Sequence, residues 1–338
     1  MIRLLLKRRE LSALFFLILL FLIAGIVNPA FLTLNNVFLS INSSVVYAVV
    51  AMGIAFVIIT GEIDVSVGAI VGISATVVGS MIRDGQPWLL ALLAGIGIGM
   101  LIGLINGFGV VTLRIPSIIM TLGTSSIIRG LMYVYTDGKW VENVPFEFKQ
   151  LSQQKFLDSF TYFYLAILLF MLLVHLIMMR SKRGKYYAAV GDNAAGANLL
   201  GIPVARTKLT AFVICGVLSA LGGVIFVSRV GFVTPIAGVG YEMKVIAACV
   251  IGGISLSGGV GNILGACIGA AFMASISRVL VFIGLSSDLD DTITGVLLII
   301  IVVVDALLRK RSIEHARRER LSAKTLDLGG INNEAKTV

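Results

Sequence analysis

The chain has 338 residues, of which 58% are hydrophobic and 13% charged, and its mean hydropathy is +1.01. This composition excludes an ordinary soluble domain, because apolar runs of roughly 18 or more residues recur and that length crosses a hydrocarbon layer of about 30 Å. The net charge of +9 comes largely from chain ends and loops, so it reports membrane topology and not nucleic-acid binding.

The apolar runs predict an all-α, polytopic membrane protein with about ten transmembrane helices. Basic residues precede the first span and follow the last, which places both termini in the cytoplasm. We expect a transmembrane domain at 1–310 with a cytoplasmic loop at 181–208, and a basic, then disordered, cytoplasmic tail at 311–338. The predicted spans lie near residues 11–27, 44–61, 64–82, 88–112, 116–135, 161–179, 207–229, 241–257, 261–283 and 290–307.

Two carboxylates, Glu62 and Asp64, lie between the second and third apolar runs. A charge at membrane depth costs about 2.5–3.5 kcal/mol on insertion scales, so these residues need a physical reason. One reason is structural, since Asp64 can cap the helix that follows it. The other is functional: Asp64 and Ser66 can face a polar cavity.

Further uncharged polar residues follow at points where helices are interrupted or interior. Asn106 lies inside a long apolar span, where it would bond across helices, and Pro116 interrupts the next run. Hydroxyls and amides at such breaks suit a neutral, hydroxyl-rich solute better than an ion. The residues predicted to line a translocation path are Asp64, Ser66, Asn106, Ser117 and Thr121.

Glycine-rich segments indicate helix breaks and close helix packing. The stretch 61–72 is weakly similar to 252–265, and interrupted helices at matching places in two halves indicate a transport path, although two glycine-rich segments can also match by chance. Glycines at every fourth position predict close helix contacts without saying anything about the solute. These are Gly95, Gly99, Gly103 and Gly107, and again Gly261, Gly265 and Gly269.

The loop 181–208 carries a short helix that could dock another protein. Asp192 is expected to be its N-cap and Gly201 its stop, followed by Pro203. The alternative interpretation is a mere connector between two spans.

No catalytic or metal-binding pattern is present, so we expect no cofactor and no enzymatic activity of this chain. His175 and His315 lack partners at catalytic or metal-ligand spacing, and no phosphate-binding Gly-x-x-x-x-Gly-Lys-Ser/Thr loop occurs. Glu242 and Lys244 are expected to pair with each other at a span end. The cysteines are expected to be small packing residues and not disulfides or metal ligands: Cys215, Cys249 and Cys267.

Four motifs occur in order along the chain: 61–69, 115–124, 189–202 and 247–259. Together they resemble the permease subunits of bacterial ABC importers for monosaccharides, a family that includes the ribose, arabinose and xylose systems, and the similarity covers most of residues 10–310. The loop 138–152 further resembles the permeases of autoinducer-2 importers. Glu62 departs from the commoner Gly-Gly-Ile-Asp pattern of the first motif.

This resemblance implies a permease in the bacterial inner membrane that moves solute from a binding protein to the cytoplasm by alternating access. Expected partners are two ATP-binding cassette subunits, which would hydrolyse ATP, a second or homologous permease, an extracytoplasmic sugar-binding protein and the lipid bilayer. The favoured solute is autoinducer-2, with ribose or rhamnose next. The implied ATPase-coupling residues are Asp192, Asn193, Ala194, Ala195, Leu200 and Gly201.

Two other classes compete with this interpretation. An ion-coupled secondary sugar transporter would need paired charges within the membrane, and such residues are scarce here. A membrane enzyme would need a cluster of catalytic residues.

Overall fold

The computed structural model describes residues 9–156, 160–300 and 302–303, and contacts divide the chain into two compact units, Met1–Gly295 and Val296–Val338. The predicted span at 290–307 lies only partly within the described residues, and the predicted tail at 311–338 lies outside them.

Within the described residues the first unit is mainly helical, as the sequence predicts. Its strand pairing consists of one two-stranded antiparallel pair, β1 with β2, and an isolated bridge between Val141 and Val233. Helical residues begin again at 289, beyond the last labelled helix. The elements are α2 (Arg9–Val27), η1 (Pro29–Leu32), α3 (Leu34–Ser43), α4 (Val45–Ile59), α5 (Val67–Arg83), α6 (Trp88–Val111), α7 (Ser117–Thr136), α8 (Phe146–Gln153), β1 (Lys155–Phe156), β2 (Phe160–Thr161), α9 (Tyr162–Arg180), α10 (Lys182–Asp192), α11 (Ala194–Leu199), α12 (Val204–Val230), α13 (Tyr241–Ile251) and α14 (Ile263–Phe282).

Five helices of the described chain are long and apolar enough to cross a membrane: α6, α7, α9, α12 and α14. A sixth span results if α3 and α4, bent by 41° at their junction, are counted as one. The polytopic prediction is therefore confirmed, whereas the described helices do not reach ten by length. The predicted span 241–257 is wrong as one continuous helix, because the Gly252–Gly253 pair ends α13 at Ile251.

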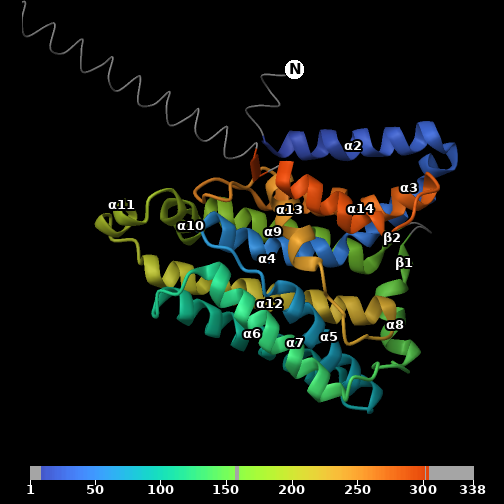
Figure 1. The fold of residues 1–338 in the computed structure, drawn as a ribbon, viewed down its shortest axis with the longest axis horizontal. Helices are drawn as coiled ribbons and strands as arrows, with labels where there is room; N and C mark the ends of the chain where they lie inside the picture. The colour runs from blue at the N-terminus through green and yellow to red at the C-terminus, as the bar shows by residue number, and fades with distance from the viewer. Residues whose placement is uncertain (1–8, 157–159, 301, 304–338) are drawn as a thin grey trace, which may run out of the picture. The chain divides into compact units, whose positions relative to one another are not determined.

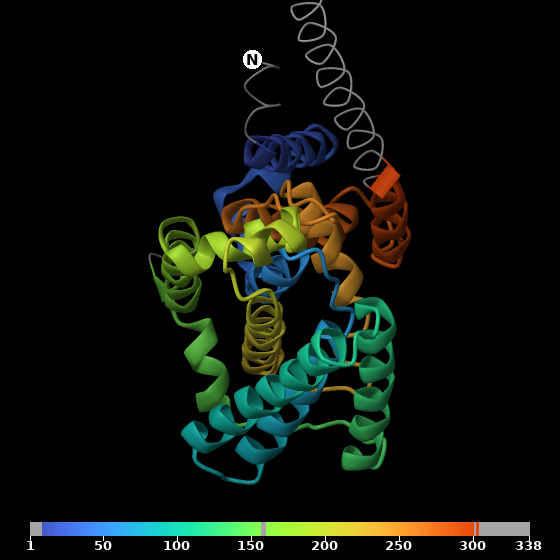
Figure 2. The same ribbon diagram turned by 90° about the vertical axis from the view of Figure 1, so that its left-hand side faces the viewer.

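Helix α12 lies at the centre of this unit and packs against α6, α4 and α5, while α14 packs against α13, α2 and α4 (Figures 1 and 2). The α6–α12 contact depends on glycine. A Cβ on Gly99 would lie 2.3 Å from the Gly216 carbonyl oxygen, and a Cβ on Gly216 would lie 2.1 Å from that of Gly99. The packing role predicted for the glycine stripe is therefore confirmed at this contact.

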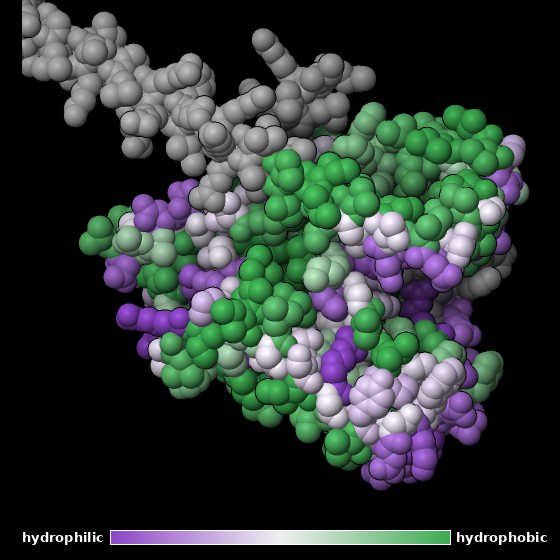
Figure 3. Space-filling model, viewed as in Figure 1, coloured by the Kyte–Doolittle hydropathy of each residue, from purple (hydrophilic) through white to green (hydrophobic). Residues whose placement is uncertain are grey.

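Burial separates the interior helices from those at the surface. Helix α4 is buried along nearly its whole length, whereas only 17% of the apolar window of α7 and of α9 is buried. In Figure 3 hydrophobic residues cover much of the face between two more hydrophilic ends. An exposed apolar surface of this extent fits lipid contact. The three cysteines are buried and free, as predicted.

Candidate functional site

The site begins at the break between α4 and α5. Helix α4 ends at Ile59, Gly61 takes a left-handed φ of 81°, and α5 starts only at Val67. The residues between them, called here the extended segment (60–66), leave the helical hydrogen-bond pattern. The N–H groups of residues 60–62 still bond to the last turn of α4, whereas those of Ile63 and Val65 need partners from elsewhere in the protein.

Helix α7 supplies two of these partners from its first turns. The N–H of Ile63 donates to Ser117 Oγ at 3.2 Å, and the N–H of Val65 donates to Thr121 Oγ1 at 3.0 Å. The Thr121 hydroxyl in turn donates to the Ser117 carbonyl oxygen at 2.8 Å. The break at Pro116 that starts α7 thus brings two hydroxyls to the backbone of the extended segment.

Asp64, Ser66 and Asn106 form a chain of hydrogen bonds beside them. Asp64 Oδ1 accepts from the Ser66 N–H at 2.8 Å and from the Ser66 hydroxyl at 2.6 Å. Asn106 Nδ2 donates to Ser66 Oγ at 2.9 Å, which confirms that Asn106 bonds across helices. The expectation that Asp64 caps α5 is confirmed in part: its carboxylate accepts the N–H of Ser66 at the start of the helix, although Ser66 and not Asp64 is the N-cap residue.

The five residues predicted for a path therefore come together, and we call them the polar cluster: Asp64, Ser66, Asn106, Ser117 and Thr121. All are buried, Asp64 and Asn106 completely. Within the described chain, Asp64 Oδ2 and Asn106 Oδ1 have no hydrogen-bond partner. A buried acceptor left unpaired costs about 1–3 kcal/mol, so a conformation that brought donors to these two oxygens would be favoured.

The break between α13 and α14 contacts the end of α4 directly. The Gly259 N–H donates to the Ile59 carbonyl oxygen at 2.9 Å, and a Cβ on Gly258 would lie 2.8 Å from the Gly61 nitrogen. The two segments of the weak repeat are therefore both helix interruptions, and they meet. Helix α10 joins them, since a Cβ on Gly191 would lie 1.9 Å from the Ile59 carbonyl oxygen.

Helices α10 and α11 form the predicted docking element, at one end of the view in Figure 1. The expected N-cap is wrong by one residue: Asp192 ends α10, and the Asn193 side chain accepts from the Gly196 N–H at 2.8 Å. Gly201 ends the element with a φ of 77°, as predicted. The side chains of Leu199 and Leu200 are 89% and 82% exposed.

All six residues predicted for docking are exposed: Asp192, Asn193, Ala194, Ala195, Leu200 and Gly201. Sequence reasoning missed Leu199, although its position beside Leu200 on a short helix in a basic loop was a signal for an exposed apolar tip.

A groove of about 650 Å³ separates α11 from the end of α6. Its lining includes Ala194, Asn198, Val110 and two charged residues, Glu62 and Lys208. The Lys208 ammonium lies 2.5 Å from Glu62 Oε1. This ion pair joins the extended segment to α12, and nothing in the sequence pointed to it.

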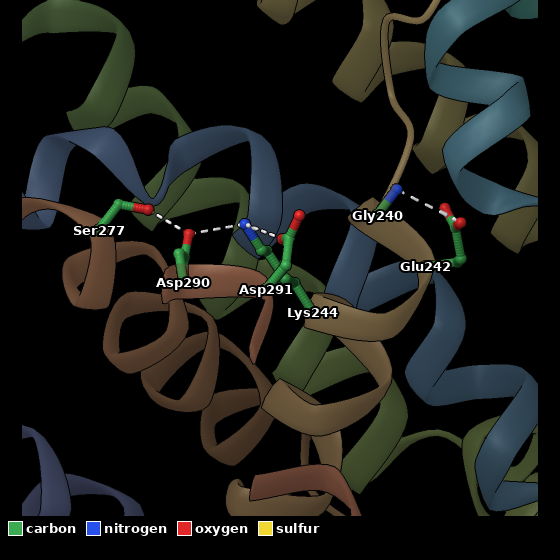
Figure 4. Close-up of polar contacts among 6 residues, drawn as sticks. All are labelled: Gly240, Glu242, Lys244, Ser277, Asp290 and Asp291. Carbon is green, nitrogen blue, oxygen red and sulfur yellow. Dashed lines mark hydrogen bonds and ion pairs between the residues drawn. The ribbon is translucent and has the colours of Figure 1, made fainter. Parts of the chain in front are cut away.

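A second group of charges surrounds the other end of α13 (Figure 4). Lys244 Nζ lies 2.7 Å from Asp290 Oδ2 and 3.4 Å from Asp291 Oδ1, and Ser277 donates to Asp290. The predicted Glu242–Lys244 pair is wrong, because residues two apart on a helix do not face each other. Glu242 Oε1 instead accepts from the Gly240 N–H at 3.3 Å.

A cavity of about 390 Å³ lies at the ends of α5 and α7 that are distant from α11. Arg83, Tyr135 and Trp140 are among its lining residues. The Trp140 ring stacks on Phe232 at 5.8 Å, which fixes one wall of the cavity.

One further charge escaped the sequence analysis. Arg129, in the middle of α7, donates to the Ala237 carbonyl oxygen at 2.5 Å. The rule that charges within apolar spans need a reason would have found it. The described residues contain no group of three or more His, Cys, Asp or Glu that could hold a metal ion.

A family model described as a branched-chain amino acid transport system / permease component matches residues 36–302. The autoinducer 2 import system permease protein LsrC of Enterobacter sp. (strain 638) is 42% identical over 318 residues, which cover 94% of this chain and 92% of the relative. The same-named proteins of Klebsiella pneumoniae and Escherichia coli K12 are 41% and 37% identical, over 94% and 95% of this chain and 92% and 93% of theirs. No solved structure matches the chain.

Proposed function

Because the chain belongs to the family of permease components of ABC importers, we propose that it moves a small polyhydroxylated solute across the inner membrane by alternating access. The polar cluster is the observation that carries this proposal. It is buried at a helix break and retains two unpaired acceptors, Asp64 Oδ2 and Asn106 Oδ1. Solute hydroxyls can donate to both, at a net gain of about 1 kcal/mol each. Such weak contacts suit a route that must release what it admits.

The favoured solute is autoinducer 2, with ribose or rhamnose next. The names of the relatives support autoinducer 2, whereas the family model's description names branched-chain amino acids. The cluster itself favours a neutral solute. An amino acid is a zwitterion: Asp64 could pair with its ammonium group, but none of the five cluster side chains carries a positive charge to balance its carboxylate.

The partners follow from the same proposal. Two ATP-binding cassette subunits dock on α11 at the cytoplasmic face, where Leu199 and Leu200 provide an exposed apolar tip. Their closure on ATP shifts α11 and switches the permease between inward and outward states. A second or homologous permease completes the pore, and both termini are cytoplasmic.

An extracytoplasmic binding protein delivers the solute at the opposite face. Its proposed docking surfaces are the loop 138–152, whose first residues line the cavity beside Trp140, and the turn 286–291. Tight recognition then belongs to the binding protein, and the permease needs only low affinity.

Transport into sealed vesicles tests this proposal. The permease is reconstituted with its ATPase and binding protein, and uptake of autoinducer 2, ribose, rhamnose and leucine is measured with ATP. We expect autoinducer 2 to accumulate and leucine not to. Accumulation driven by a sodium or proton gradient without ATP would instead support an ion-coupled secondary transporter.

A further inference from the structure

The ion pair between Glu62 and Lys208 is a long-range contact beneath α11. Its atoms lie 2.5 Å apart, and the two side chains are only 17% and 22% exposed. The residues are 146 positions apart in the chain, so no local turn explains their pairing. Glu62 also stands where the commoner family motif has a glycine, which could not form this contact.

The pair connects two parts of the molecule that the proposed function uses. Glu62 belongs to the extended segment and lies just before Asp64, whose carboxylate organises the polar cluster. Lys208 belongs to the beginning of α12, just after Gly201 ends the α11 element. The contact therefore links the docking element to the polar cluster with a single pair of side chains between them.

The extended segment is held from both sides of α11. On one side, Gly191 of α10 packs against the carbonyl oxygen of Ile59, the last residue of α4 immediately before the extended segment; this is a contact of backbone with backbone. On the other side, the extended segment is held to α12 by Lys208 through Glu62. A displacement of α11 must act on α10 and α12, since it is joined to each by a short connection.

The groove beside α11 leaves space into which this helix can move. Glu62 and Lys208 line it together with Ala194, Ala195 and Asn198 of α11. An inward shift of α11 would bring that helix toward the ion pair and not toward a closed apolar core. Because an ion pair is directional when it is also a hydrogen bond, Lys208 then carries the carboxylate of Glu62 with it.

We infer that the Glu62–Lys208 ion pair transmits the movement of α11 and α12 to the polar cluster, so that both are positioning residues for coupling ATP hydrolysis to transport. This inference rests on the proposed function. It gives Glu62 a role: its ion pair connects α12 to the extended segment. This connection stands beside the contact of α10 with Ile59 at the end of α4.

The test uses the full importer in vesicles and measures the number of solute molecules imported per ATP hydrolysed. Glu62→Gln and Lys208→Gln should each lower this ratio at least five-fold while ATPase association and basal ATP hydrolysis stay intact. The double variant E62Q/K208Q should be no worse than either single variant, because both changes break one contact. The exchanged pair E62K/K208E should recover at least half of the wild-type ratio.

A control removes an exposed charge that belongs to none of these surfaces. Arg180 is the exposed last residue of α9, and R180Q should leave the ratio unchanged. A merely structural role for Glu62 would lower the amount of importer, and uptake and hydrolysis together, without changing the ratio; that result would overturn the inference.

Two further outcomes decide the remaining cases. The inference would also be overturned if the losses of the two single variants added up in E62Q/K208Q and the exchanged pair E62K/K208E recovered none of the wild-type ratio. If Glu62→Gln fails to accumulate in the membrane, Lys208→Gln and the exchanged pair make the same comparison. Should the wild-type importer itself not use ATP to import any tested solute, the proposed function fails, whereas a wild-type importer whose variants keep its ratio refutes the inference alone.

Discussion

Replacing Thr121 by valine isolates one contact that holds the extended segment in place. Valine matches threonine in shape but lacks the hydroxyl, which accepts from the Val65 N–H at 3.0 Å. Thr121 is completely buried. In Thr121→Val the Val65 N–H therefore loses its partner at a place where water cannot readily replace it.

The size of the effect follows from that geometry. A buried donor left unpaired costs about 1–3 kcal/mol. Thr121 also donates to the Ser117 carbonyl oxygen four residues earlier in its own helix, and valine loses this bond too. Thr124 serves as the control, because it lies on the same helix and donates at 3.0 Å to the Met120 carbonyl oxygen in the same way. The difference between the two valine variants thus reports the bond to Val65.

Unfolding in mixed detergent and dodecyl sulfate micelles, followed by far-UV circular dichroism, measures that difference. We expect the free energy of unfolding of Thr121→Val to fall about 1–3 kcal/mol below that of Thr124→Val, with Thr121→Ser close to wild type. Equal stabilities of the two valine variants would refute the assignment of Thr121 as a partner of the extended segment.

Three other changes test neighbouring features. Gly191→Ala places a Cβ 1.9 Å from the Ile59 carbonyl oxygen; because backbone cannot rotate away, we expect a loss of about 1–3 kcal/mol in the same unfolding assay. Replacing Leu199 and Leu200 by serine should leave unfolding unchanged, since both are exposed, but should abolish co-purification of the ATPase. Ser117→Cys in a background without the native cysteines should react with a small water-soluble thiol reagent in at least one nucleotide state, and inertness in every state would move the path elsewhere.

The polar cluster could be predicted from the sequence because membrane burial makes polar residues conspicuous. Asp64, Ser66, Asn106, Ser117 and Thr121 stood out as costly groups beside helix breaks. The structure brings all five together, since each satisfies part of the same interrupted backbone or its side chains.

The exact N-cap of α11 and the ion-pair partner of Lys244 could not be predicted from the sequence, because both depend on how the helices pack. Asp192 and Asn193 are both good N-cap residues, and the choice between them depends on where α10 ends. That end lies beside the contact of Gly191 with Ile59. Likewise Lys244 forms an ion pair with Asp290, 46 positions away, and not with its near neighbour Glu242. The sequence contains no pattern that predicts this long-range ion pair.

The two connections that hold the extended segment differ in kind: one joins α10 to Ile59 at the end of α4, and the other joins α12 to Glu62. The α10 connection is a backbone contact at Gly191, which leaves no side chain to rotate, so Ile59 must follow α10 closely. The α12 connection is a hydrogen-bonded ion pair between two side chains, so Glu62 stays with Lys208 while both side chains can change rotamer. Without the Glu62 carboxylate only the stiff connection would remain. With it, a movement of α12 can reach the extended segment without unfolding α4.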